Sequence, residues 1–137
     1  MEPQHLARQA DPQGDPRRAN EAAKSGAQAL VVSNHGGRQL DGAPSSIEAL
    51  PEIVDTVGSR MEIMLDSGVR SGQDVMRALA LGAKSCMIGR AYVHGLGGGG
   101  EAGVAKAIDV IRNELLTTMG LCGVNTIAEI DDHVLAI

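Results

Sequence analysis

A histidine and an arginine stand three positions apart in the segment SNHGGRQ, residues 33–39, with only two glycines between them. The segment follows the apolar run ALVV and has the character of a strand end passing into a loop, where functional side chains are often found. A histidine side chain can accept a proton in catalysis, so His35 is a candidate base. Arg38 can hold a substrate carboxylate in a fixed orientation. The pair therefore predicts a base and a carboxylate clamp that share one pocket.

Two further loops carry glycine close to arginine. The segment DSGVR supplies Asp66, Gly68 and Arg70, and the segment IGRA supplies Gly89 and Arg90. Glycine lets backbone N–H groups approach an anion, and an arginine guanidinium makes paired hydrogen bonds to phosphate oxygens. Both segments follow apolar runs, so the two loops are predicted to converge on one phosphate. Turn glycines beside solvated arginines are the alternative.

The elements that must position these loops alternate along the chain. Apolar runs predict strands over 28–33, 61–65 and 84–88. Helical segments are predicted to end at Gly26, Gly58 and Gly82, and a long amphipathic helix is predicted over 101–119. Capping-type segments SSIE, SGQD and TIAE mark helix starts, and Pro51 is expected to restart a helix at its first turn.

Alternation of this kind predicts an α/β fold with a parallel sheet and right-handed crossovers. In a TIM (β/α)8 barrel the site lies at the carboxyl ends of the strands, and the loops after the last two strands commonly bind phosphate. Three strands cannot close such a barrel. The chain is therefore predicted to be the C-terminal three β/α units of a TIM barrel, with the barrel incomplete.

Composition limits the function further. The 137 residues carry a net charge of −5 and 1% aromatic residues, which gives no footprint for nucleic acid. Cys86 and Cys122 lack ligand spacing, so neither a disulfide framework nor a metal site is expected, and a cytoplasmic location is the default.

Residues 1–16 are expected to form a disordered leader and residues 17–137 the domain. The GGGG run at 97–100 is expected to be a flexible linker, and His5, His94 and His133 to be surface residues.

SNHGGRQ resembles the active-site signature of the FMN-dependent α-hydroxy-acid dehydrogenases and oxidases, the family of L-lactate dehydrogenase, glycolate oxidase and mandelate dehydrogenase. The stretch LDSGVRSGQDVMRALALGAKSCMIGRA resembles that family's flavin-phosphate segment. The resemblance covers residues from about 17 to 137. It implies FMN as cofactor and oxidation of an (S)-2-hydroxy acid, with L-lactate the first choice, to the 2-oxo acid. Electrons would pass on to a quinone, a cytochrome or oxygen.

The resemblance also implies roles for single residues. His35 corresponds to the active-site base and Arg38 to the arginine that binds the substrate carboxylate. Cofactor contacts are implied for Ser33 at the flavin, for Asp66, Gly68 and Arg70 in the first part of the FMN-phosphate site, and for Gly89 and Arg90 in the second.

Several family features have no counterpart in this chain: a lysine near the flavin, the active-site tyrosines and the aspartate that orients the histidine. Tyr92, the only tyrosine, stands elsewhere. Little or no turnover is therefore expected from the 137 residues alone. The full-length protein is expected to be a homo-oligomer that could contact the inner membrane peripherally.

Two alternatives remain. One is an inactive half-barrel that binds a phosphate-bearing ligand or a complementing chain, since the open edge of strand 28–33 would expose backbone groups. The other is a non-redox phosphate-binding barrel such as an isomerase, which gives SNHGGRQ no role.

Overall fold

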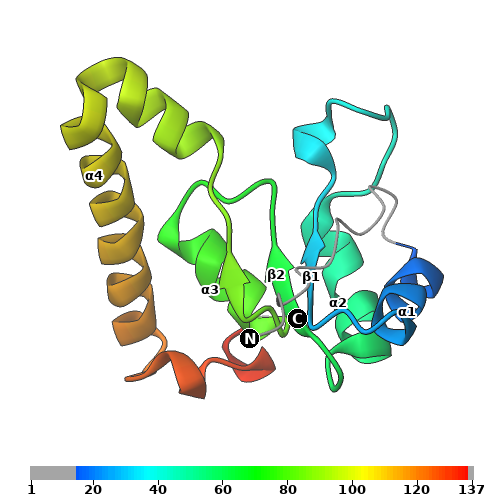
Figure 1. Ribbon diagram of the computed structural model, residues 1–137. Helices are drawn as coiled ribbons and strands as arrows, with labels where there is room; N and C mark the ends of the chain where they lie inside the picture. The colour runs from blue at the N-terminus through cyan, green and yellow to red at the C-terminus, as the bar shows by residue number, and fades with distance from the viewer. Residues whose placement is uncertain (1–14, 136–137) are drawn as a thin grey trace, which may run out of the picture.

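The computed structural model describes residues 15–135 and consists of three successive β/α units (Figure 1). The helices and strands follow in the order α1 (Pro16–Lys24), β1 (Ala29–Val32), α2 (Ser46–Val57), β2 (Glu62–Leu65), α3 (Gly72–Ala80), β3 (Ser85–Cys86) and α4 (Arg90–Leu121). Short 3-10 turns occupy His35–Gly37, Ile127–Glu129 and Asp132–Val134. The predicted alternation of helices and strands is confirmed.

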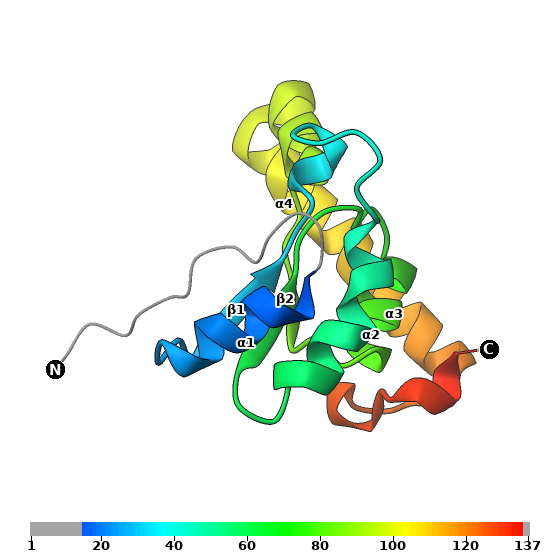
Figure 2. The same ribbon diagram turned by 90° about the vertical axis from the view of Figure 1, so that its right-hand side faces the viewer.

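The three strands form one parallel sheet in the order β1-β2-β3. Leu30 pairs with Ile63 and Val32 with Leu65, and all four side chains are buried. They join Leu50, Ile53 and Val57 of α2 in the main core cluster. Helices α2 and α3 therefore cover one face of the sheet (Figure 2). The alternate side chains, such as Val31 and Met64, lie on the opposite face and are only half-buried.

The predicted starts of α2 and α3 are confirmed by their caps, whereas TIAE begins only a 3-10 turn. Ser45 accepts the Glu48 N–H while Glu48 accepts the Ser45 N–H, and Ser71 and Asp74 form the same reciprocal pair at α3. These boxes satisfy N–H groups that the first turn of a helix leaves without partners. They fix where each loop ends, and hence where the loop residues between strand and helix can lie.

Some boundaries differ from expectation. Helix α2 runs through Pro51 instead of restarting there, because the capping box at Ser45 has already begun it. Helix α1 starts at Pro16, where the Asp15 side chain accepts the Arg17 N–H, one residue before the predicted start of the domain. Residues 1–14 lie outside the described residues. Strand β3 has two residues where 84–88 was expected, since Gly89 turns the chain into α4.

The glycine run also differs from expectation. Residues 95–98 are helical, and the break in α4 falls at Gly99 and Gly100, where Gly100 has φ +58°. A Cβ at Gly103 would overlap the backbone of Gly95, so the two arms of α4 touch through their backbones. The run is therefore a tight turn between two helical arms, and the expectation of a flexible linker is wrong.

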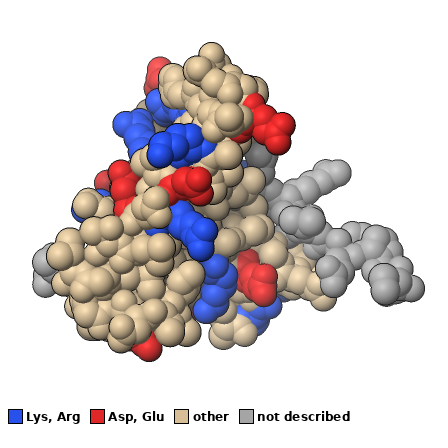
Figure 3. All heavy atoms as spheres, turned by 90° about the vertical axis from the view of Figure 1, so that its left-hand side faces the viewer, with Lys and Arg blue, Asp and Glu red and all other residues tan. Residues whose placement is uncertain are grey.

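The second arm of α4 packs on α3. A Cβ at Gly72 would overlap the backbone of Leu115, and the Gly72 N–H donates to Glu114 Oε2 at 2.9 Å. On the side of the molecule where α4 lies, acidic and basic side chains are interspersed (Figure 3). Within residues 15–135, no helix is both long and apolar enough to span a membrane.

Candidate functional site

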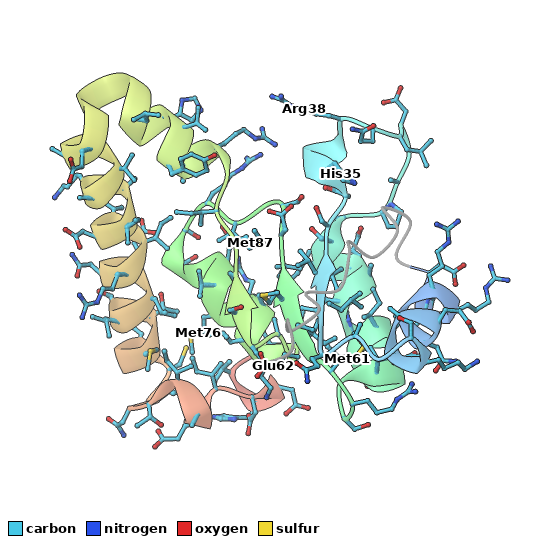
Figure 4. All side chains as sticks on the ribbon, viewed as in Figure 1. His35, Arg38, Met61, Glu62, Met76 and Met87 are labelled. Atoms are coloured by element: carbon cyan, nitrogen blue, oxygen red, sulfur yellow. The ribbon has the colours of Figure 1, made fainter. Side chains whose placement is uncertain are left out.

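Loops from all three strands meet around one cavity at the carboxyl ends of the sheet. The cavity has a volume of about 510 Å³. The residues that line it include seven singled out from the sequence: His35, Arg38, Asp66, Gly68, Arg70, Gly89 and Arg90. His35 and Arg38 lie at the same end of the sheet, on the segment that follows β1, and Met87, just after β3, lies below them (Figure 4). The sheet therefore gathers residues from loops that are far apart in the sequence.

The loop that carries His35 has an unusual backbone. His35, Gly36 and Gly37 all have positive φ, at 55°, 69° and 72°. A side chain is disfavoured in this left-handed region, so the histidine conformation must be held by its surroundings. Each of the three N–H groups donates to a side-chain oxygen: His35 to Ser33 Oγ at 3.1 Å, Gly36 to Ser67 Oγ at 3.0 Å, and Gly37 to Asn34 Oδ1 at 3.2 Å.

Asp66 connects this loop to the loop after β2. Its Oδ2 accepts the Ser33 hydroxyl at 2.5 Å, and the Ser67 hydroxyl lies 3.2 Å from the same oxygen. Hydrogen bonds from hydroxyl to carboxylate are short and strong. The sequence prediction places Asp66 with the phosphate loop. The structure adds that this carboxylate also supports the histidine loop, through the two serine hydroxyls.

Ser33 is the one predicted site residue that does not line the cavity. Its side chain is buried, with 4% of the residue exposed. The hydroxyl donates to Asp66 and accepts from the His35 N–H, so both of its functions are used inside the protein. Ser33 thus supports the loop from beneath.

The part of the cavity lining that follows β2 and β3 is suited to an anion. Arg70 and Arg90 both line it, and α4 starts at Arg90 without a side-chain cap at Gly89. The first turn of a helix carries N–H groups without helical partners and a partial positive charge, which together favour phosphate. A Cβ added at Gly68 or Gly89 would meet nothing within 4 Å, so the space before both glycines is open.

Sequence reasoning missed Ser67 and Asn34, which bind the histidine loop through their side chains. Ser67 is also a non-glycine residue at φ +78°. The Ser-Gly pair at 67–68 is a turn signal, but it does not show which distant N–H the hydroxyl will meet.

A second cavity of about 290 Å³ lies behind the same loops, and its lining includes Asn34, Ser46, Asp74 and Arg77. It shares Ser67, Gly68 and Arg90 with the first cavity. The two cavities therefore adjoin each other at the loop after β2.

Other reactive groups do not take part in this constellation. Burial raises the pKa of the Cys86 thiol to about 11, so the group stays protonated at neutral pH and is a poor nucleophile. His94 and His133 are exposed, as expected, and His5 lies outside the described residues. Over residues 15–135, no group of three or more His, Cys, Asp or Glu side chains could hold a metal ion.

The fold and the loops together define a class: consecutive β/α units of a barrel, with a cavity lined by a histidine, by Arg38 and by two further arginines suited to an anion. Comparison with known proteins agrees with this class. The model of the family "FMN-dependent dehydrogenase" matches residues 14–137. The chain therefore belongs to the FMN-dependent dehydrogenase family, as the resemblance in the sequence implied.

Individual relatives and structures lead to the same family. L-lactate dehydrogenase of Caulobacter sp. (strain K31) is 52% identical over 122 residues, which are 89% of this chain and 32% of that protein. A crystal structure of mandelate oxidase with 3,3-difluoro-2-hydroxy-3-phenylpropionic acid superimposes with a TM-score of 0.82 at 40% identity, over 88% of this chain and 36% of that one. Lactate oxidase of Pediococcus acidilactici gives 0.85 at 40% identity, over 90% and 34%. The chain thus spans about a third of the length of the curated relatives that it matches.

The side chains present suit the phosphate of FMN. Arg70 and Arg90 supply two permanent positive charges, and the uncapped start of α4 supplies backbone N–H groups. The open space before Gly68 and Gly89 leaves room for the group to approach. The cavity fits the phosphate of FMN because these side-chain and backbone groups all donate hydrogen bonds.

Proposed function

We propose that this chain forms the phosphate-binding and base-carrying part of an FMN-dependent (S)-2-hydroxy-acid dehydrogenase or oxidase. The observation that carries the proposal is the single cavity that His35, Arg38, Arg70 and Arg90 line together. These residues follow three different strands. A ligand that is anionic at one end and reactive at the other would contact all four side chains. FMN supplies a two-electron acceptor when it is bound.

Arg70 and Arg90, with the start of α4, hold the cofactor phosphate. Gly68 and Gly89 keep the backbone close to it. The His35 imidazole takes a proton from the substrate, at either the α-carbon or the hydroxyl, and Arg38 binds the substrate carboxylate. Both groups stand on one short loop, so the orientation of the loop sets the position of the α-carbon relative to the base.

The substrate class follows from these roles together with the relatives. A carboxylate clamp beside a base suits a 2-hydroxy acid, and the Caulobacter relative is an L-lactate dehydrogenase. L-lactate is therefore the proposed substrate and pyruvate the product. A quinone, a cytochrome or oxygen would take the electrons. The cytoplasmic location, with peripheral contact to the inner membrane for the full-length protein, and the homo-oligomeric state remain predictions.

The proposal has a direct test in two parts. First, the purified chain is titrated with FMN, and quenching of flavin fluorescence measures binding; Arg70→Ala and Arg90→Ala should weaken it, whereas Arg18→Ala on the distant α1 should not. Second, residues 14–137 replace the matching third of the Caulobacter relative, and the hybrid enzyme is assayed with L-lactate. We expect turnover by the hybrid and almost none by the chain alone. Loss of both FMN binding and hybrid turnover would contradict the proposal.

The alternative of an inactive half-barrel gains one observation. In the described sheet, β1 and β3 each pair with β2 only, so each has an unpaired edge. A chain that adds parallel strands at these edges would complete the sheet. FMN binding by the chain without turnover in the hybrid would favour this alternative.

A further inference from the structure

We propose that Ser67 is a positioning residue, which holds the His35–Gly37 loop in its active conformation from the loop after β2. This inference deepens the proposed function and rests on it for the role of His35. No catalytic contact is assigned to Ser67, because its hydrogen bonds reach neither the imidazole of His35 nor the guanidinium of Arg38. Its influence on the site comes through the backbone of the histidine loop.

The His35–Gly37 loop makes three hydrogen bonds from its N–H groups to side chains. Ser33 and Asn34, which accept two of them, are only two or three residues away in sequence and belong to the same segment. Ser67, which accepts the Gly36 N–H at 3.0 Å, is 31 residues away. Of the two local acceptors, Ser33 reaches the β2 side of the cavity through its own bond to Asp66. The bond from Gly36 to Ser67 ties the histidine loop to that side directly.

The Ser67 hydroxyl is itself fixed. It lies 3.2 Å from Asp66 Oδ2, to which it can donate, and 3.3 Å from Ser33 Oγ. The backbone carbonyl of Ser67 accepts the Ser46 hydroxyl at 3.1 Å. An oxygen that donates to a carboxylate is a better acceptor for an N–H group, because hydrogen bonds in a chain polarise one another. The Asp66–Ser67–Gly36 chain thus connects the loop near the phosphate wall to the loop of the base.

The backbone of Ser67 supports a role for its side chain. At φ +78° a glycine would be more comfortable, and Gly68 beside it has φ +86°. A serine in this conformation is strained, and such strain is commonly found where a side chain has a function. Here the hydroxyl offsets the strain through bonds that glycine cannot make.

Two substitutions separate the effect of the Ser67 hydroxyl from the effect of the backbone strain. Ser67→Ala removes the hydroxyl and keeps the Cβ, while Ser67→Gly removes both. Both variants should increase the amide exchange rate of Gly36 about tenfold, because a net hydrogen bond corresponds to roughly this factor. Ser67→Gly should lower the urea midpoint of unfolding less than Ser67→Ala does, because it loses the same hydroxyl bonds but relieves the backbone strain. Ser46→Ala serves as the matched control, because it removes a hydroxyl bond to Ser67 that does not reach the histidine loop.

The second readout is kinetic and uses the hybrid enzyme. Ser67→Gly should lower kcat for L-lactate about tenfold, with the FMN affinity within about twofold of the parent, although the substitution relieves the backbone strain. Unchanged Gly36 exchange in both variants would overturn the inference, as would unchanged kcat with increased exchange. If the parent hybrid is inactive while Gly36 exchange responds, the loop attachment stands and the proposed function is wrong.

Discussion

Two glycine-rich segments of this protein are used in opposite ways. In SNHGGRQ the glycines supply positive φ next to His35, and side-chain oxygens from Ser33, Asn34 and Ser67 hold the backbone. In GLGGGG the helix continues to residue 98, and the arms of α4 meet where Gly95 faces Gly103. In the first segment glycine serves conformation around functional side chains, and in the second it serves close approach.

The difference is visible in what surrounds each segment. The first lies beside two cavities whose walls carry arginine, serine and aspartate. The second is exposed, and a Cβ at Gly97, Gly98 or Gly99 would meet nothing within 4 Å. A run of glycines therefore does not by itself indicate a binding loop; the polar partners of its N–H groups do.

The largest effect is expected from the functional side chain of the first segment. His35→Gln in the hybrid enzyme should lower kcat for L-lactate by about 10²–10⁴, the usual contribution of a positioned base. FMN affinity should not change. His94→Gln, on an exposed histidine of α4, is the control and should keep the parental rate. A rate within about threefold of the parent for His35→Gln would show that another group takes the proton.

The second segment should respond in stability rather than in chemistry. Gly103→Ala places a Cβ on the backbone of Gly95 and should destabilise the chain by about 1–3 kcal/mol, measured by urea unfolding. Gly97→Ala adds the same methyl group in open helical space and should stabilise by about 0.5–1 kcal/mol. If both variants moved the midpoint in the same direction, close approach would not be the role of this segment.

In SNHGGRQ, position 37 should require glycine only because of its positive φ. A Cβ at Gly37 meets nothing within 4 Å, but φ is +72°. Gly37→Ala should therefore destabilise by about 1 kcal/mol through the backbone. The same unfolding measurement applies, and Gly97→Ala is again the control. A stabilising Gly37→Ala would mean that the loop relaxes to another conformation.

The smallest expected effect distinguishes the segments by pH. The loop after SNHGGRQ ends at Ser45, whose hydroxyl and backbone N–H hold the pKa of Glu48 below its usual 4.5. A lowered pKa means that the cap stabilises the fold above about pH 4.5 and that this contribution is lost as the pH falls through the lowered value. Protection of the Ser45 amide from exchange should fall below this pH, whereas protection across Gly95–Gly98 should not follow the same transition. Glu48→Gln should remove the pH dependence; an unchanged profile would contradict it.

Much of the fold could be read from local patterns. The alternation of apolar runs with capped helices predicted all three strands and their parallel order in a barrel, because strand burial and helix capping are short-range properties. Errors occurred where packing between distant segments decides. Pro51 lies inside α2, and the glycine run forms a tight turn between two helical arms, because packing and caps outside those residues determine the outcome.

The candidate site could be predicted by residue type but not in its connections. His35, Arg38, Arg70 and Arg90 stand out in the sequence, and the sheet brings them to one cavity. Ser67 and the partners of Asp66 could not be predicted, because a serine hydroxyl gives no sign in sequence of which N–H it will meet.

The sequence by itself determined which chemical groups this protein holds and the order of the strands that carry them, since both follow from residue type and short-range periodicity. Only the tertiary structure decided that Ser67 holds the loop of His35 and that Ser33 lies beneath it. Those hydrogen bonds join two loops that are brought within about 3 Å only by the pairing of β1 with β2.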